Sequence, residues 1–118
     1  MTDEPAPRYA IELSGSAEAD IDSHIFYLLG ISPDLAGTWE QDLRRTLDSL
    51  EVFPRRCPAA PEGSVFGRDV RQLLFGRGKN MCRVFFVVRD EPGEHPPAVR
   101  ILRVIHASRR LSDQSDEP

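Results

Sequence analysis

The sequence predicts an α+β fold in which a helical hairpin packs on one face of a small, mainly antiparallel sheet. Two observations support this prediction. Three short apolar runs rich in Val, Ile and Phe occupy residues 70–75, 81–88 and 99–106, as expected of largely buried strands. Two amphipathic helical patterns precede them, and a short alternating segment comes before the helices. The predicted order is strand, helix, helix, strand, strand, strand.

The first strand and the start of the first helix are predicted from residues 8–16. Tyr9, Ile11 and Leu13 alternate with polar residues, which is typical of a half-buried strand. Ser14 or Ser16 then provides a helix N-cap. The first helix therefore begins directly after the first strand.

Each of the two helices carries one apolar stripe. In the first helix the stripe recurs every three or four residues and ends before Gly30. The second helix begins at Ser32-Pro33-Asp34, with a capping serine and proline at the first helical position, and stops by Pro54. The link between them is too short for anything but an antiparallel hairpin. The stripes are Ala17, Ile21, Ile25 and Leu28, then Leu35, Ala36, Trp39, Leu43, Leu47 and Leu50.

Residues 54–69 are rich in proline and glycine and are predicted to form a loop across the surface. The three later strands are joined by short links, so they should form an antiparallel meander. Phe85 and Phe86 should point to opposite faces of the sheet, with at least one packed under the helices.

The 118 residues are enough for one domain. We expect a disordered tail over residues 1–7, a folded domain over 8–111 and a flexible acidic tail over 112–118. No window approaches ~18 consecutive apolar residues, and the N-terminus lacks the pattern of a signal peptide. A cytoplasmic protein with no membrane contact is expected, with Cys57 and Cys82 as free thiols.

Charge is distributed unevenly along the chain. Residues 8–51 carry 3 basic and 9 acidic side chains, a net of −6, whereas residues 52–111 carry 12 basic and 5 acidic ones, a net of +7. The basic half could meet nucleic acid or an acidic protein segment. The simpler interpretation, which we favour on charge alone, is that the two halves neutralise each other on folding.

Cationic side chains on or beside an apolar sheet cost desolvation unless an anionic group meets them. Arg71, Arg83, His106 and Arg109 all lie in or next to the predicted strands. They are therefore the candidate functional residues. No two histidines have a metal-binding spacing, so no metal site is expected, and the chain has no nucleotide- or cofactor-binding motif such as GxGxxG or a P-loop.

The order of elements and a set of short motifs resemble the RelE/ParE superfamily of type II toxin–antitoxin toxins. Two motifs are the most telling: Cys82-Arg83-Val84-Phe85-Phe86, where the family usually has Tyr-Arg, and Ile105-His106-Ala107-Ser108-Arg109, where many members have His-Gly-x-Arg. Further pieces of the resemblance lie at residues 17–21, 27–28, 36–43, 49–54 and 70–73.

The resemblance implies a growth-inhibiting toxin, held inactive in a hetero-oligomer by a cognate antitoxin that wraps an acidic amphipathic segment over it. RelE-like members cleave mRNA in the ribosome, whereas ParE-like members poison DNA gyrase. We favour the ParE-like class. The alternatives are a ribosome-dependent endoribonuclease and a non-toxic module that only binds an antitoxin.

In a nuclease, the resemblance implies that Arg83 stabilises the reacting phosphate, and His106 could serve as the general base. The alternative for Arg83 is an ion pair with a carboxylate of the helical hairpin. The alternative for His106 is a hydrogen bond to a loop carbonyl, and for this residue we favour the alternative. Arg71, Arg83 and Arg109 could instead bind RNA phosphate or the antitoxin, although a solvated edge cation is the favoured interpretation of Arg71.

Three departures from the nuclease pattern favour the ParE-like class. Leu73 stands where a second cation would be needed on the face of Arg71, and neither Tyr9 nor Tyr27 is near the C-terminus. An acidic tail and a pI near 5.3 also suit entry into the ribosome poorly.

Overall fold

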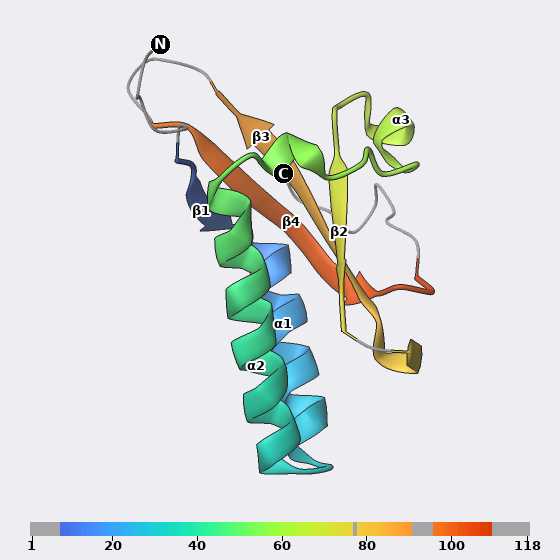
Figure 1. The fold of residues 1–118 in the computed structure, drawn as a ribbon. Helices are drawn as coiled ribbons and strands as arrows, with labels where there is room; N and C mark the ends of the chain where they lie inside the picture. The colour runs from blue at the N-terminus through green and yellow to red at the C-terminus, as the bar shows by residue number, and fades with distance from the viewer. Residues whose placement is uncertain (1–7, 77, 91–95, 110–118) are drawn as a thin grey trace.

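The computed structural model describes residues 8–76, 78–90 and 96–109 (Figure 1). It contains a four-stranded mixed sheet with a helical hairpin on one face, in the predicted order of elements. The predicted tails, residues 1–7 and 112–118, lie outside the described residues. Within the described part, no helix is long and apolar enough to cross a membrane.

The helical hairpin consists of α1 (Gly15–Leu29) and α2 (Pro33–Asp48), which lie side by side along the sheet and extend beyond it in Figure 1. Ser14 caps α1 by accepting a hydrogen bond from the Ala17 amide, which decides between the two predicted caps. Ser32 caps α2, with Pro33 at the first helical position as predicted. Of the predicted stripes, only Leu35 is exposed.

The sheet has the strand order β1-β4-β3-β2. The strands are β1 (Ala10–Leu13), β2 (Arg71–Phe75), β3 (Cys82–Arg89) and β4 (Ala98–His106). The meander β2-β3-β4 is antiparallel as predicted, and β1 adds to β4 in parallel. The helical hairpin connects β1 to β2 at the other edge of the sheet, and it provides the long connection that strands running in the same direction require.

The main core lies between the hairpin and the sheet. Trp39, Leu43 and Leu47 of α2 pack there with residues of the two central strands, among them Val84 and Phe86. The apolar stripes of the two helices therefore face the sheet and are buried against it.

The segment predicted as a plain surface loop is more ordered than expected. It contains the short 3₁₀ turn η2 (Pro54–Arg56) and the one-turn helix α3 (Gly63–Phe66). A further 3₁₀ turn, η1 (Ser49–Glu51), comes just before it. This segment covers the second face of the sheet, where Ala60 and Val70 pack against Phe85, Leu102 and Ile105. Phe85 and Phe86 do point to opposite faces, and both are fully buried. The prediction missed this cover because four helical residues show no periodicity.

Two local irregularities shape the strands near the site. Leu102 is an extra residue in β4, because Arg103 pairs with Phe85 while Ile101 pairs with Phe86. Gly76, after β2, has φ 104°, and a Cβ there would lie 2.7 Å from the Asn80 carbonyl oxygen, so the β2–β3 turn requires glycine. Both cysteines are free and buried, as predicted.

Candidate functional site

Arg83 is held in a buried ion pair on the α3 face of the sheet. Its Nη1 and Nη2 donate to the two carboxylate oxygens of Glu62 at 2.8 and 2.7 Å. Nε and Nη2 also donate to Gln72 Oε1, and Nη1 donates to the Arg109 carbonyl oxygen. The guanidinium lies 4.4 Å from the Phe85 ring centroid. All five N–H donors of this arginine therefore have partners within the chain.

Glu62 was not anticipated as the partner of Arg83. The carboxylates that we considered as partners were those of the helical hairpin, but the Arg83 side chain lies on the other face of the sheet and pairs with Glu62 there. The Glu62 side chain is only 6% exposed and that of Arg83 12%, so the pair is largely removed from solvent. A single acid in a Pro/Gly-rich segment carries no sequence signal for this role.

Arg71 joins β2 to the segment that precedes α3. Its Nη1 donates to the carbonyl oxygens of Arg55 and Cys57 at 2.9 and 2.7 Å, and its Nε donates to Asp69. Arg71 therefore holds the backbone of residues 55–57 by hydrogen bonds. The interpretation that we favoured, a solvated edge cation, is wrong.

His106 ends β4 with both ring nitrogens in hydrogen bonds. Nε2 lies 2.6 Å from the Lys79 carbonyl oxygen, which can only accept, so Nε2 carries the proton. Nδ1 then accepts from the Ser108 hydroxyl and amide, at 2.7 and 3.1 Å. A bond from this histidine to a loop carbonyl is the arrangement that our favoured interpretation expected.

Arg83 and His106 lie on opposite faces of the sheet. In the β3–β4 register Cys82 pairs with His106, whereas Arg83 pairs with Ile105. Cys82 belongs to the hairpin core and Ile105 to the α3 cluster, which assigns each pair to its face. The two proposed catalytic side chains therefore do not converge on one point, and their catalytic role stays a prediction.

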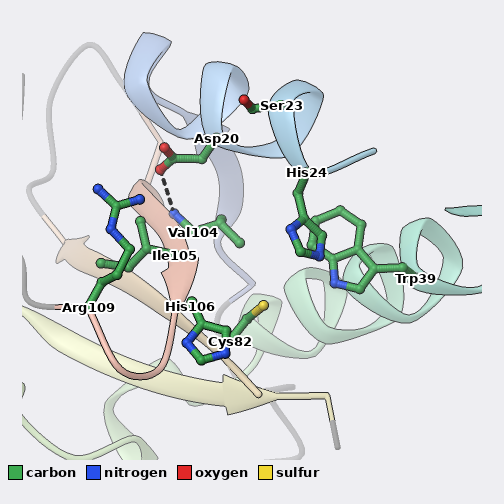
Figure 2. Close-up of a pocket in the computed structure, with 9 residues that line it drawn as sticks. All are labelled: Asp20, Ser23, His24, Trp39, Cys82, Val104, Ile105, His106 and Arg109. Carbon is green, nitrogen blue, oxygen red and sulfur yellow. Dashed lines mark hydrogen bonds between the residues drawn. The ribbon is translucent and has the colours of Figure 1, made fainter. Parts of the chain in front are cut away.

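Arg109 lines a cavity of about 220 Å³ between α1, α2 and the end of β4. Figure 2 shows Asp20, Ser23 and His24 reaching it from α1, Trp39 from α2, and Cys82 and His106 from the sheet. Arg109 is the one proposed binding arginine whose guanidinium makes no hydrogen bond or ion pair among the described residues.

His24 and Cys82 have shifted ionisation in this cavity. Burial, and then the charge of His106, lower the pKa of His24, whose ring lies 4.5 Å from that of Trp39. Burial raises the pKa of the Cys82 thiol, and the neighbouring indole of Trp39 partly offsets this. Both groups therefore favour their neutral forms. The structure agrees with the prediction that Trp39 belongs to the core.

Asp20 of α1 and Arg103 of β4 form a second buried ion pair. Arg103 Nε and Nη2 donate to the Asp20 carboxylate at 2.6 and 2.9 Å, and the Val104 amide donates to the same carboxylate at 2.9 Å. This is the pairing with the acidic early turns of α1 that we considered for Arg83. A different arginine, Arg103 of the neighbouring strand β4, makes it.

A wider cleft of about 470 Å³ lies beside the far end of β3. Four arginines line it: Arg55, Arg68, Arg89 and Arg100. Arg55 pairs with Asp90, whose pKa is lowered by hydrogen bonds from Arg55 and then Tyr9. Arg89 and Arg100 both reach Glu12. The two halves of the chain thus neutralise each other at Glu12 and Asp20, in line with the favoured interpretation of the charge asymmetry.

The fold places this protein in a class. A helical hairpin on a four-stranded mixed sheet of order β-α-α-β-β-β, with cations in the last two strands, is the RelE/ParE-like toxin architecture. The family model described as ParE toxin of type II toxin-antitoxin system, parDE, matches residues 11–111. The chain belongs to this family and is the toxin component of a type II toxin–antitoxin system, which implies a cognate antitoxin as partner.

A search of curated proteins finds no match to this chain. Among the described residues, no group of three or more His, Cys, Asp or Glu side chains is placed to hold a metal ion.

Proposed function

We propose that this toxin inhibits DNA gyrase, does not cleave RNA, and is neutralised by its cognate antitoxin. One observation supports DNA gyrase over RNA as the target. The cation and the base that an endoribonuclease would need, Arg83 and His106, are engaged within the chain and lie on opposite faces of the sheet.

Breaking the hydrogen bonds of Arg83 is energetically costly. A phosphate could reach its guanidinium only by displacing the Glu62 carboxylate and breaking both hydrogen bonds of this largely buried ion pair. His106 would have to release the Ser108 donors before Nδ1 could take a proton. RNA chemistry would therefore need rearrangement at both residues, whereas a poison that acts by contact needs neither.

The outer end of the hairpin is a candidate surface for contact with the target. Four apolar side chains gather where α1 turns into α2, and Phe26 is 80% and Ile31 59% exposed. Leu29 and Leu35 complete this group, which we call the hairpin tip. Exposed apolar groups gathered at one place are typical of protein interaction surfaces.

The antitoxin is proposed to bind the arginine-lined cleft. Three of its four arginines are already paired to carboxylates of this chain, but Arg68 makes no ion pair with any of the described residues. An acidic segment of a partner could pair with Arg68 while its apolar side chains cover Val87 and Val88. In this proposal Arg109 remains a further binding residue, whereas Arg71 and Arg83 support the surface from within.

The first test is inducible expression of the toxin alone in a bacterium, with incorporation of labelled thymidine and labelled amino acids followed over minutes. We expect DNA synthesis to fail first while translation continues. A collapse of translation first would support the endoribonuclease. Accumulation of folded protein with no growth defect would support the non-toxic binding module.

The second test maps the proposed target contact. Purified toxin is added to a gyrase supercoiling assay, with Ile31→Ser as the tip variant and Val65→Ser as its control. Val65 is as exposed as Ile31 but lies on α3, on the other face of the sheet. We expect Ile31→Ser to lose inhibition at least ~10-fold and Val65→Ser and His106→Ala to keep it. Loss of toxicity in a folded His106→Ala variant would instead favour the nuclease.

A further inference from the structure

The cavity between the hairpin and the end of β4 has polar groups besides Arg109, among them Ser23 and His24, to which the proposed function gives no role. It measures about 220 Å³, room for several water molecules or for one short side chain. It is separate from the arginine-lined cleft and from the hairpin tip, which have no lining residue in common with it.

The uncommitted groups on its wall are donors or can become donors. The Arg109 guanidinium has no partner among the described residues, and neither the Ser23 hydroxyl nor the His24 ring makes a hydrogen bond there. The Trp39 indole N–H, in a side chain only 9% exposed, has the Cys82 thiol, a weak acceptor, as its neighbour and makes no other hydrogen bond in this part of the chain. An unpaired buried donor is unfavourable, so an acceptor is the group that such a wall lacks.

The acceptors on the same wall are already satisfied. The Asp20 carboxylate receives three hydrogen bonds from Arg103 and Val104, and both His106 nitrogens are occupied. A cationic ligand would therefore find no free carboxylate in the cavity. The ligand should instead be an anion.

The remaining residues that line the cavity favour one kind of anion. Val104 and the Trp39 ring give the cavity an apolar part, beside which an aliphatic stem can lie. The negative Asp20 carboxylate on the wall disfavours a dianion more than a monoanion. A planar carboxylate also matches the fork of the Arg109 guanidinium.

We propose that this cavity is a binding site for a carboxylate on a short aliphatic stem, as in a glutamate or aspartate side chain. Arg109 pairs with the carboxylate, Ser23 and His24 add hydrogen bonds, and the Trp39 ring lies against the stem. Figure 2 shows the Arg109 guanidinium beside Asp20 at one side of the cavity and His24 and Trp39 together at the other, so a ligand whose carboxylate meets Arg109 extends its stem toward the two rings. The site does not depend on whether gyrase is the target.

The single tryptophan of the chain is on this wall, so it reports binding directly. The full-length protein is titrated with N-acetyl-glutamate N-methylamide at constant ionic strength, while Trp39 emission and the single indole N–H resonance are followed. The glutamine analogue, which has the same shape without the charge, is the matched control ligand. We expect a saturable change with the first compound and none with the second.

Variants test the assignment to Arg109. Arg109→Gln should weaken binding at least ~10-fold, the loss expected for a charge-assisted pair. Arg45→Gln removes another exposed cation, on α2 and outside this cavity, and should leave the affinity unchanged within about twofold. Because Arg109 is exposed and its guanidinium is unpaired in the described structure, its replacement should not unfold the protein.

Three results would overturn the proposal. One is a response that does not saturate or is equal for the two analogues. Another is unchanged affinity in Arg109→Gln. The third is inorganic phosphate binding more tightly than the glutamate analogue, because this would reject the carboxylate in favour of a phosphate site.

Discussion

The two faces of the sheet are closed in different ways. On the hairpin face, two helices of fifteen and sixteen residues supply a continuous apolar core. On the α3 face, a small cluster of five buried residues lies beside the Arg83–Glu62 pair. Two arginines of the sheet are buried in ion pairs, and the carboxylate comes from the long helix α1 for Arg103 and from a short irregular segment for Arg83.

The two faces therefore contribute differently: one mainly stabilises the fold, and the other mainly fixes the position of a segment. Burial of apolar surface stabilises in proportion to area, so the hairpin face should carry most of the folding free energy. A buried ion pair contributes little net stability, yet it strongly penalises any arrangement that leaves one partner alone. The Glu62–Arg83 pair therefore fixes where the α3 segment lies, more than how firmly the protein folds.

Truncation of the two adjacent phenylalanines should give the largest effect and compare the two cores directly. Phe86→Ala should destabilise by about 5 kcal/mol and Phe85→Ala by about 3 kcal/mol, the two ends of the range for such changes. Both rings are fully buried, but the short α3 segment can collapse onto a cavity more readily than two long helices can. Urea unfolding measures both, and a larger loss for Phe85→Ala would contradict the comparison.

Breaking the two ion pairs should rank next. Asp20→Asn should cost about 3 kcal/mol, because it removes the carboxylate charge that pairs with the buried Arg103 guanidinium. Glu62→Gln should cost about 2 kcal/mol, since Arg83 keeps Gln72, the Arg109 carbonyl and the Phe85 ring. Thermal and urea unfolding give both values. The control is Asp20→Leu combined with Arg103→Met, which should cost less than Asp20→Asn alone, and a greater cost would count against this account.

The helix caps should give a smaller effect that depends on burial. Ser14 is fully buried, caps α1 and donates to the Leu102 carbonyl oxygen at 2.9 Å, so Ser14→Ala should cost about 2 kcal/mol. Ser32 is partly exposed and its capping bond is 3.4 Å long, so Ser32→Ala should cost about 0.5 kcal/mol. Unfolding curves of the two variants compare them, and equal losses would show that the link from α1 to β4 adds nothing.

The smallest effect should be a dependence of stability on pH that comes from His24. Its pKa in the folded protein is lowered below the ordinary value of 6.5, chiefly by burial. The unfolded chain therefore binds more protons just below pH 6.5, so stability is fully present above that pH and falls on acidification. The fall in melting temperature between pH 7.5 and 5.5 should be smaller in His24→Gln than in the wild type. An equal or larger fall in the variant would contradict this assignment.

The elements with strong periodicity could be predicted from the sequence. Two stripes at helical spacing, a capping serine before each helix and the apolar strands predict the hairpin, the sheet and the family resemblance. The segment over 54–69 could not be predicted in the same way, because η2 and α3 are too short for a repeating pattern. Their position depends on contacts made by Arg71, Arg83 and Glu62.

The candidate site was predicted only as a set of residue types. Arg71, Arg83, His106 and Arg109 are cations beside apolar strands, and the sequence alone identifies the desolvation cost of placing them there. It does not determine the partner that meets each one, because partners such as Glu62 are distant in the sequence. It also does not determine that Arg83 and His106 face opposite ways, which follows from the strand register.

The sequence by itself determined the class of fold and the family, because periodicity, caps and local motifs are properties of neighbouring residues. The tertiary structure alone decided which arginine pairs with which acid, which face each cation occupies, and which donors surround the cavity at Trp39 and Arg109. The physical reason is that a buried charge is stabilised by contacts across strands and helices, and register and one extra residue in β4 set those contacts.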